Sequence, residues 1–149
     1  MITSFSGKYA FLSNFYPAPI KDFDYDITYP TVEHFFQATK TLNKPWRDLI
    51  AAAPTAGQAK RLGRQVPLRS DWEDIKVDIM CMGVRQKFSD PELCKMLLET
   101  GNETLIEGNT WHDKFWGACQ CPICSGGANM LGKILMRVRE EKKNESRII

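Results

Sequence analysis

The feature that most constrains the fold is a short helical segment that begins after Pro30 and ends near Lys40. Thr31 suits the N-cap position, because its hydroxyl can accept a hydrogen bond from a free amide of the first turn. The following side chains recur at helical spacing and predict one face packed into a core: Val32, Phe35, Phe36 and Thr39.

The same segment carries a polar stripe formed by Glu33, Gln37 and Lys40, at positions i, i+4 and i+7. Such a stripe usually meets solvent, but aromatic residues flank this one: Tyr29, Phe35, Phe36 and Trp46. In the first turn the helix dipole favours ionised Glu33, whereas burial among aromatic rings would raise the pKa of its carboxyl. Glu33 is therefore a candidate catalytic group, and a solvated helix start is the alternative.

The bulk composition is that of one globular domain, residues 1–149, with a net charge of only +2. This charge gives no global electrostatic case for nucleic-acid binding. We find neither a signal peptide nor an apolar run long enough to span a bilayer, so no membrane partner is expected. The five cysteines are an odd number, which favours a reducing compartment and a cytoplasmic location.

The first part of the chain predicts two extended regions. Aromatic residues within 5–16 are expected in the core, partly as a strand: Tyr9, Phe11, Phe15 and Tyr16. A bend at Ser13-Asn14 would turn its polar groups toward a pocket. A strand is expected over 23–29, where apolar residues alternate with Asp22, Asp24 and Asp26 on a solvated face.

The rest of the chain is mostly helical in pattern. Helices are expected through Leu49 and Ile50, over 56–62, 72–88, from Pro91 to Gly101, and over 128–143, with residues 140–149 as a frayed tail. Gly63 should close the second of these as its C′ residue. A capping box at Ser70 to Glu73 should start the third, with an inward face of Trp72, Ile75, Ile79 and Met82. A short strand is expected over 104–107.

Two basic regions could hold a phosphate group. One is the cluster of Lys60, Arg61 and Arg64, for which a solvated face is the alternative. The other is the start of the last helix, where exposed amides following Gly127 would form an anion site. Asn129 is expected to cap that helix, and Lys133 lies one turn further on.

The segment 111–117 has no helical period, yet it holds two tryptophans and a phenylalanine around Asp113. Tryptophan is rarely left on a loop without something to cover, so this segment predicts a pocket wall. Gly117 would permit either a close approach or an unusual backbone angle.

The following loop holds Cys119, Cys121 and Cys124, which together with His112 offer four zinc-type ligands. The spacing is weaker evidence than paired C-x2-C motifs, and Pro122 suggests a loop shaped by turns. From the sequence we therefore expect no metal, with free thiols on the loop. A structural zinc site is the alternative.

Several blocks of the chain, in order, resemble the NADAR, or YbiA-like, N-glycosidases. They are Phe11-Leu12-Ser13-Asn14-Phe15-Tyr16, Val32-Glu33-His34 with Phe36-Gln37-Ala38 and Lys40, Ala59-Lys60 with Gly63-Arg64, Asp71-Trp72, Lys87-Phe88, Leu97-Leu98 with Thr100-Gly101, Asp113 with Phe115-Trp116-Gly117, and Asn129 with Leu131-Gly132-Lys133, Leu135-Met136 and Val138-Arg139. The resemblance covers nearly the whole chain. It departs from many relatives at the cysteine loop, which replaces a loop rich in glycine and aspartate.

The resemblance implies an α+β fold, mainly helical in a single domain with a small β-sheet. It also implies hydrolysis of an N-glycosidic bond between a ribosyl unit and a nitrogen base. Two substrates are associated with the family: ribosylaminopyrimidine phosphates of riboflavin biosynthesis, and ADP-ribose attached to guanine in DNA. Neither reaction requires a metal or an organic cofactor.

Within this resemblance, Glu33 and Asp113 are the expected catalytic carboxylates. Glu33 would stabilise positive charge or activate water, and Asp113 would orient a ribose hydroxyl or assist the water. The expected substrate contacts are Lys40 and Lys133 for a phosphate, helped by amides near Asn129, Trp72 and Trp116 for the base or sugar, and Asn14 as a polar contact.

Two other functional classes stay open at this point. One is a non-catalytic module that binds ADP-ribose or a nucleotide. The other is a zinc-stabilised DNA-associated protein.

Overall fold

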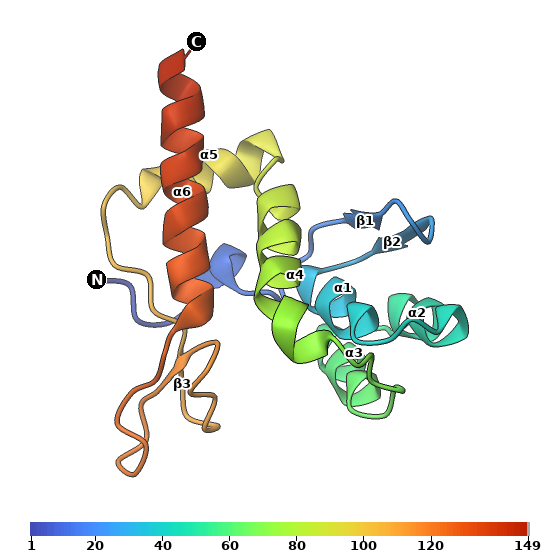
Figure 1. The fold of residues 1–149 in the computed structure, drawn as a ribbon. Helices are drawn as coiled ribbons and strands as arrows, with labels where there is room; N and C mark the ends of the chain where they lie inside the picture. The colour runs from blue at the N-terminus through green and yellow to red at the C-terminus, as the bar shows by residue number, and fades with distance from the viewer. Residues whose placement is uncertain (149) are drawn as a thin grey trace. The chain divides into compact units, whose positions relative to one another are not determined.

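Short helices dominate the computed structural model, which describes residues 1–148 (Figure 1). Contacts group the described residues into two compact units, Asn14–Lys87 and Met1–Ser13 together with the chain from Phe88 onward. The predicted mainly helical α+β class is confirmed. In chain order the elements are η1 Gly7–Leu12, β1 Ile20–Asp22, β2 Ile27–Tyr29, α1 Val32–Thr39, α2 Lys44–Ala51, α3 Ala56–Gly63, α4 Trp72–Lys87, α5 Pro91–Glu99, β3 Gly108–Asn109, β4 Ala118–Cys119 and α6 Met130–Ile148.

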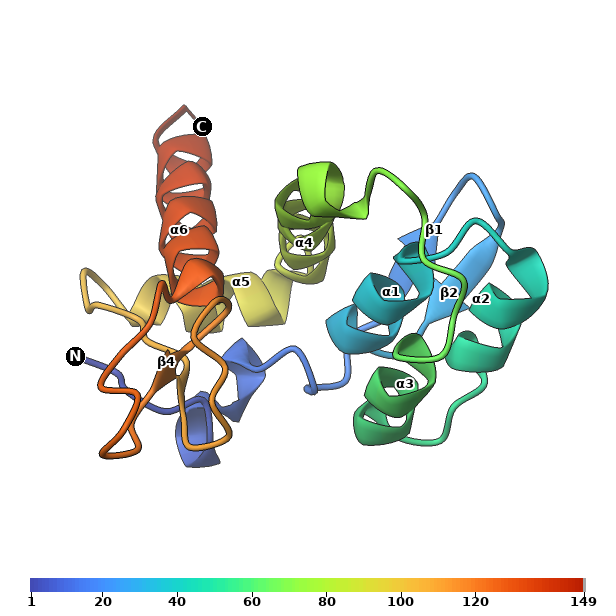
Figure 2. The ribbon, with the colours of Figure 1, turned by 60° about the horizontal axis from the view of Figure 1, so that its bottom comes forward.

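Helix α1 is the centre of the unit formed by residues 14–87. It packs against α2, α3 and α4, and every one of its residues is buried. Strands β1 and β2 form an antiparallel pair beside it, and Figure 2 shows α1, α2 and α3 gathered at this hairpin. The predicted N-cap is confirmed, since the Thr31 hydroxyl accepts from the backbone N–H of His34 at 3.1 Å.

The other unit is built around α6. Its predicted inward face is confirmed, because Leu131, Ile134, Leu135 and Val138 are all buried. Helix α5 packs against it, and β3 and β4 form a short parallel pair near its beginning. Helix α6 continues to Ile148, so residues 140–148, which we expected to fray, are helical, while residue 149 lies outside the described residues.

The aromatic N-terminal segment differs from its prediction. Residues 7–12 form a 3-10 helix instead of a strand, and Phe15 is 48% exposed. Aromatic content alone therefore misidentified this element, because a 3-10 turn can bury Phe11 and Leu12 while its other side chains stay accessible. The predicted bend at Ser13-Asn14 is present.

The strand predicted over 23–29 from its alternating pattern is also wrong over most of its length. Only residues 27–29 are extended, and Phe23, 79% exposed, lies in the turn between β1 and β2. Asp22 does not meet solvent as predicted, since Arg47 donates to its carboxylate at 2.8 Å and the two side chains are only 4% (Arg47) and 9% (Asp22) exposed. A buried ion pair, invisible in a period-two pattern, accounts for this difference.

Smaller differences concern helix faces and ends. Met82 is 55% exposed, and Met80, Cys81 and Val84 are buried on α4 in its place. Gly63 is the last residue of α3, and Arg64 is the C-cap. Leu105, within the predicted strand 104–107, forms only an isolated parallel bridge with Ile2. None of the described helices is both long and apolar enough to cross a membrane.

Candidate functional site

Glu33 lies in the first turn of α1 and is only 7% exposed. Its backbone N–H donates to the carbonyl of Asn14 at 3.1 Å, which ties the helix start to the bend before β1. The Asn14 side chain in turn donates to the sulfur of Met80 at 3.4 Å. Because Glu33 is buried, the alternative of a solvated helix start is excluded for this residue.

The polar stripe is a connected set within α1. Gln37 Nε2 donates to Glu33 Oε1 at 3.4 Å. The Gln37 side chain is 4% exposed, and its Oε1 accepts no hydrogen bond from any described residue. Buried acceptors of this kind are rare in folded proteins, so Gln37 is a functional candidate that sequence reasoning placed on the stripe but did not include in the site.

Lys40 completes the stripe at the C-cap of α1. Burial lowers the pKa of Lys40, and the negative charge of Glu33 opposes this shift. Positive charges on Arg64, Lys60 and Lys76 lower the pKa further. The basic cluster predicted from the sequence is thus electrostatically continuous with Lys40, an arrangement suited to an anionic group such as a phosphate.

Of the aromatic residues predicted around the stripe, Phe36 lies beside Lys40. Trp72, the expected stacking residue, is not an open surface. It is 5% exposed, and its ring packs against Phe36 with centroids 5.0 Å apart. Lys40 Nζ lies 5.9 Å from the centroid of the same Phe36 ring. Trp72 therefore supports the face of α1 that carries Lys40.

Lys87 is a second residue that sequence reasoning did not assign to the site. It is 2% exposed at the end of α4, and its Nζ lies 5.7 Å from the ring centroid of Tyr16. Burial lowers the pKa of Lys87 to about 7. A lysine buried this deeply is uncommon, and the Lys87-Phe88 block was the sequence signal that could have identified it.

In the other unit, Asp113 organises the segment 111–117. Asp113 Oδ1 accepts from the backbone N–H groups of Phe115 at 3.1 Å and Trp116 at 3.0 Å. Asn109 fixes the backbone of Asp113, donating to its carbonyl at 2.9 Å and accepting from its N–H at 3.1 Å. The carboxylate of Asp113 is thus held in one orientation by the turn that it stabilises.

Trp116 is half-buried and packs edge to face against Phe115, with centroids 4.8 Å apart. Phe115 is 38% exposed and Trp111 is 60% exposed. The segment therefore keeps accessible aromatic surface, as a pocket wall requires. The predicted close approach at Gly117 is confirmed, because a Cβ there would collide with the Glu107 carbonyl.

The predicted anion site at the start of α6 is wrong. The amides of residues 128–131 donate to the carbonyls of residues 114–117, at distances between 2.7 and 3.1 Å. Asn129 uses its side chain to accept from the N–H of Glu107 and to donate to the carbonyl of Leu105, both at 2.9 Å. Asn129 thus positions two loops, and Lys133 stands exposed on α6 without these amides beside it.

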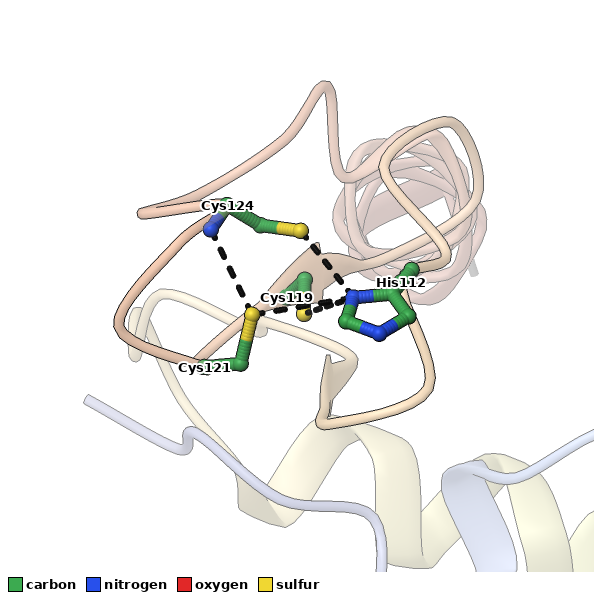
Figure 3. Close-up of side chains that lie close together, drawn as sticks. All are labelled: His112, Cys119, Cys121 and Cys124. Carbon is green, nitrogen blue, oxygen red and sulfur yellow. Dashed lines mark hydrogen bonds between the residues drawn. The ribbon is translucent and has the colours of Figure 1, made fainter.

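The four residues of the metal alternative come together in this same unit. The ligand atoms of His112, Cys119, Cys121 and Cys124 all lie within 4.8 Å of one another. Figure 3 shows His112 Nδ1 directed toward the sulfur atoms.

Comparison with known proteins gives one family and several relatives, of whose own length the chain covers between 23% and 87%. The model of the NADAR domain family matches residues 3–142. The chain is 38% identical to N-glycosidase YbiA of Escherichia coli K12 over 141 residues, covering 93% of this chain and 84% of that protein. It is also 38% identical to the chloroplastic riboflavin biosynthesis protein PYRR of Zea mays over 146 residues, 87% of this chain but only 23% of that protein. The solved structure of E. coli YbiA matches with a TM-score of 0.82 and 34% identity, over 99% of this chain and 88% of that one.

Proposed function

Because the chain belongs to the NADAR domain family, we propose that it is an N-glycosidase that hydrolyses the bond between a ribosyl unit and a nitrogen base. The observation that carries the proposal is the burial of the Glu33 carboxylate in the first turn of α1. Gln37 donates a hydrogen bond to this carboxylate, and the positive charge of Lys40 lies close enough to interact with it. Relatives named N-glycosidases align with 84% or more of their length.

Cleavage of an N-glycosidic bond passes through a transition state with positive charge spread over C1′ and the ring oxygen of the sugar. A fixed negative charge lowers the energy of this state more than that of the substrate. Glu33 supplies that charge, and the hydrogen bond from Gln37 holds the carboxylate in place. Gln37 acts only through Glu33 in this assignment, because its Oε1 is buried and lies against Gly63.

Asp113 is the second carboxylate of the proposal. Since its Oδ1 accepts from two backbone amides, the orientation of its other oxygen is fixed. A preorganised carboxylate can align a ribose hydroxyl or receive a proton from water without reorganising during the reaction. In this assignment Asn109 is a positioning residue, because it acts only through the backbone of Asp113.

A ribosyl phosphate is the substrate class that these charges favour. Lys40 binds the phosphate, and the Lys60 and Arg64 charges that depress its pKa strengthen the local positive potential. Trp116, which keeps accessible ring surface, stacks on the base. Lys133 is a further cation for a phosphate, whereas Trp72 and Asn129 support neighbouring elements instead of contacting substrate.

Ribosylaminopyrimidine phosphates of riboflavin biosynthesis fit this class, and two relatives are named for that pathway, of whose length the chain covers 23% and 36%. ADP-ribose on guanine in DNA has the same glycosidic chemistry and a second phosphate, for which the exposed Arg61 and Arg64 on and beside α3 are candidates. The net charge of +2 gives no global electrostatic case for DNA binding, so the small-molecule substrate is preferred.

The test offers both substrates to the wild-type protein and to Glu33→Gln. We expect release of ribose phosphate by the wild type and a loss of about a hundredfold to a thousandfold in kcat for the variant. Glu92→Gln is the matched control, because Glu92 is also a first-turn glutamate but is exposed on α5.

Turnover by folded Glu33→Gln near the wild-type rate would contradict the assignment of Glu33. Tight binding of either ligand by the wild type without product release would support the non-catalytic module instead. Cleavage of ADP-ribosylated DNA alone would select the second substrate.

A further inference from the structure

The cluster of His112, Cys119, Cys121 and Cys124 has the geometry of a preformed coordination shell. The distances from His112 Nδ1 to the sulfur atoms are 3.1 Å for Cys124, 3.6 Å for Cys121 and 3.8 Å for Cys119. All four side chains turn inward to one point, while His112 Nε2 points away from it (Figure 3). With zinc–sulfur bonds of about 2.3 Å and a zinc–nitrogen bond of about 2.0 Å, tetrahedral coordination separates ligand atoms by roughly 3.5 to 3.8 Å.

The backbone holds these ligands in place from several directions. Cys119 belongs to β4 and pairs through its backbone with Gly126, with hydrogen bonds of 3.0 and 2.9 Å. The N–H of Cys124 donates to the sulfur of Cys121 at 3.3 Å, an interaction that a thiolate strengthens. His112 has φ of +70°, a left-handed conformation that costs free energy in a residue with a side chain and directs its ring at the cysteines.

We propose that these four side chains bind a zinc ion that fixes the loop between Trp111 and Gly127. Three sulfur ligands and one imidazole select a borderline-soft metal of tetrahedral preference, and exclude Mg²⁺ and Ca²⁺, which take oxygen ligands. A closed set of four protein ligands leaves no position for water or substrate, so the ion is structural.

This inference does not depend on the proposed enzymatic activity. Its consequence for the loop is direct, since His112 immediately precedes Asp113. The loop buries little apolar surface: Trp111 is 60% exposed and Ile123 is 90% exposed. A metal ion would supply the free energy that such a loop lacks in packing. The four converging ligand atoms thus favour the zinc alternative over the metal-free loop that the sequence suggested.

The first experiment measures zinc by elemental analysis in the full chain, purified without chelator under reducing conditions. We expect stoichiometric zinc in the wild type, retained in Cys94→Ser and lost from Cys121→Ser and Cys124→Ser. Cys94 is the matched control because it is a half-buried free cysteine on α5, outside the cluster. Background zinc in the wild type, or equal loss in Cys94→Ser, would overturn the proposal.

A second measurement is independent of variant folding. The metal is removed from the wild type with a chelator, and Co²⁺ is added while the absorption spectrum is recorded. Tetrahedral sulfur-rich coordination predicts intense visible d–d bands and a thiolate-to-cobalt charge-transfer band, which excess Zn²⁺ abolishes. A spectrum of octahedral Co²⁺, or a disulfide within the loop in the unreduced protein, would contradict the assignment.

Discussion

Helix α1 and the segment 111–117 carry the two carboxylates of the proposed enzyme, Glu33 and Asp113. The two regions hold their carboxylate in opposite ways. In α1 the repeating backbone hydrogen bonds and a buried apolar face fix every side chain, so Glu33 is placed by its neighbours. In the segment the candidate group holds the backbone itself, since Asp113 binds two of the amides that follow it. A substitution of Glu33 in α1 can therefore remove the catalytic carboxylate without changing the fold. A substitution of Asp113 removes both the carboxylate and the hydrogen bonds that hold its turn.

Replacement of Asp113 should give the largest effect that separates these two contributions. We expect Asp113→Ala to lower kcat/KM by about a hundredfold or more, because it removes a charged group and the turn that orients it. Asp113→Asn keeps an oxygen that can accept from Phe115 and Trp116, so thermal stability should stay near the wild-type value while activity remains low.

The control for Asp113 is Asp90→Ala at the N-cap of α5. Asp90 also accepts from two backbone amides, at 2.9 and 3.0 Å, but carries no proposed chemistry. The Asp90→Ala variant should lose about 1 kcal/mol of stability, and its folded form should keep the wild-type activity. Full activity in Asp113→Asn would reduce Asp113 to a positioning residue and weaken the comparison between the two regions.

The two regions also differ in how much of their structure the sequence could predict, because one depends on local periodicity and the other on contacts between distant residues. The extent and N-cap of α1, and the inward face of α6, follow from local periodicity, and the structure confirms them. The occupied amides at the start of α6 were unpredictable, because their partners are carbonyls of residues 114–117, held by a loop with no period. The burial of Asp22 likewise depends on Arg47, a contact between residues far apart in sequence.

The candidate site shows the same division. Glu33, Gln37 and Lys40 could be placed on one stripe from spacing alone. The burial of Lys87 could not be predicted from spacing, because the apolar pattern of α4 does not show which residues cover its last turn. Met82 was assigned inward by the same pattern and is exposed. Periodicity predicts which residues share a face, and packing decides which face is covered.

Gly63→Ala tests whether α1 needs its neighbour to keep Gln37 in place, and its effect should be smaller than that of Asp113→Ala. A Cβ at Gly63 would collide with the carboxamide of Gln37. We expect a loss of about 1 to 3 kcal/mol in stability and a partial loss of kcat, because the displaced Gln37 no longer holds Glu33.

Gly57→Ala is the control, because Gly57 lies in α3 with Gly63 and a Cβ there meets only the Thr55 hydroxyl oxygen at 3.9 Å. It should be neutral or stabilise the protein by about 0.5 to 1 kcal/mol. Adding Gln37→Ala to Gly63→Ala removes the collision and should restore stability without restoring kcat. Restored kcat in the double variant would show that Gln37 has no part in orienting Glu33.

The smallest expected effect is a pH dependence that belongs to α1 and originates at His34. His34 Nε2 donates to the carbonyl of Ala53 at 3.0 Å, and Nδ1 lies 2.7 Å from the Thr31 hydroxyl, from which the neutral ring accepts. Burial lowers the pKa of His34 below its ordinary value. As pH falls through about 6.5, the unfolded chain takes up a proton before the folded one does, so the free energy of unfolding decreases until the folded pKa is passed. Urea unfolding at pH 7.5 and pH 5 should show this loss in the wild type and a shallower one in His34→Gln, which is less stable at both values but has no ring to titrate. Parallel pH profiles for the two proteins would show that burial at the start of α1 does not disfavour the charged ring.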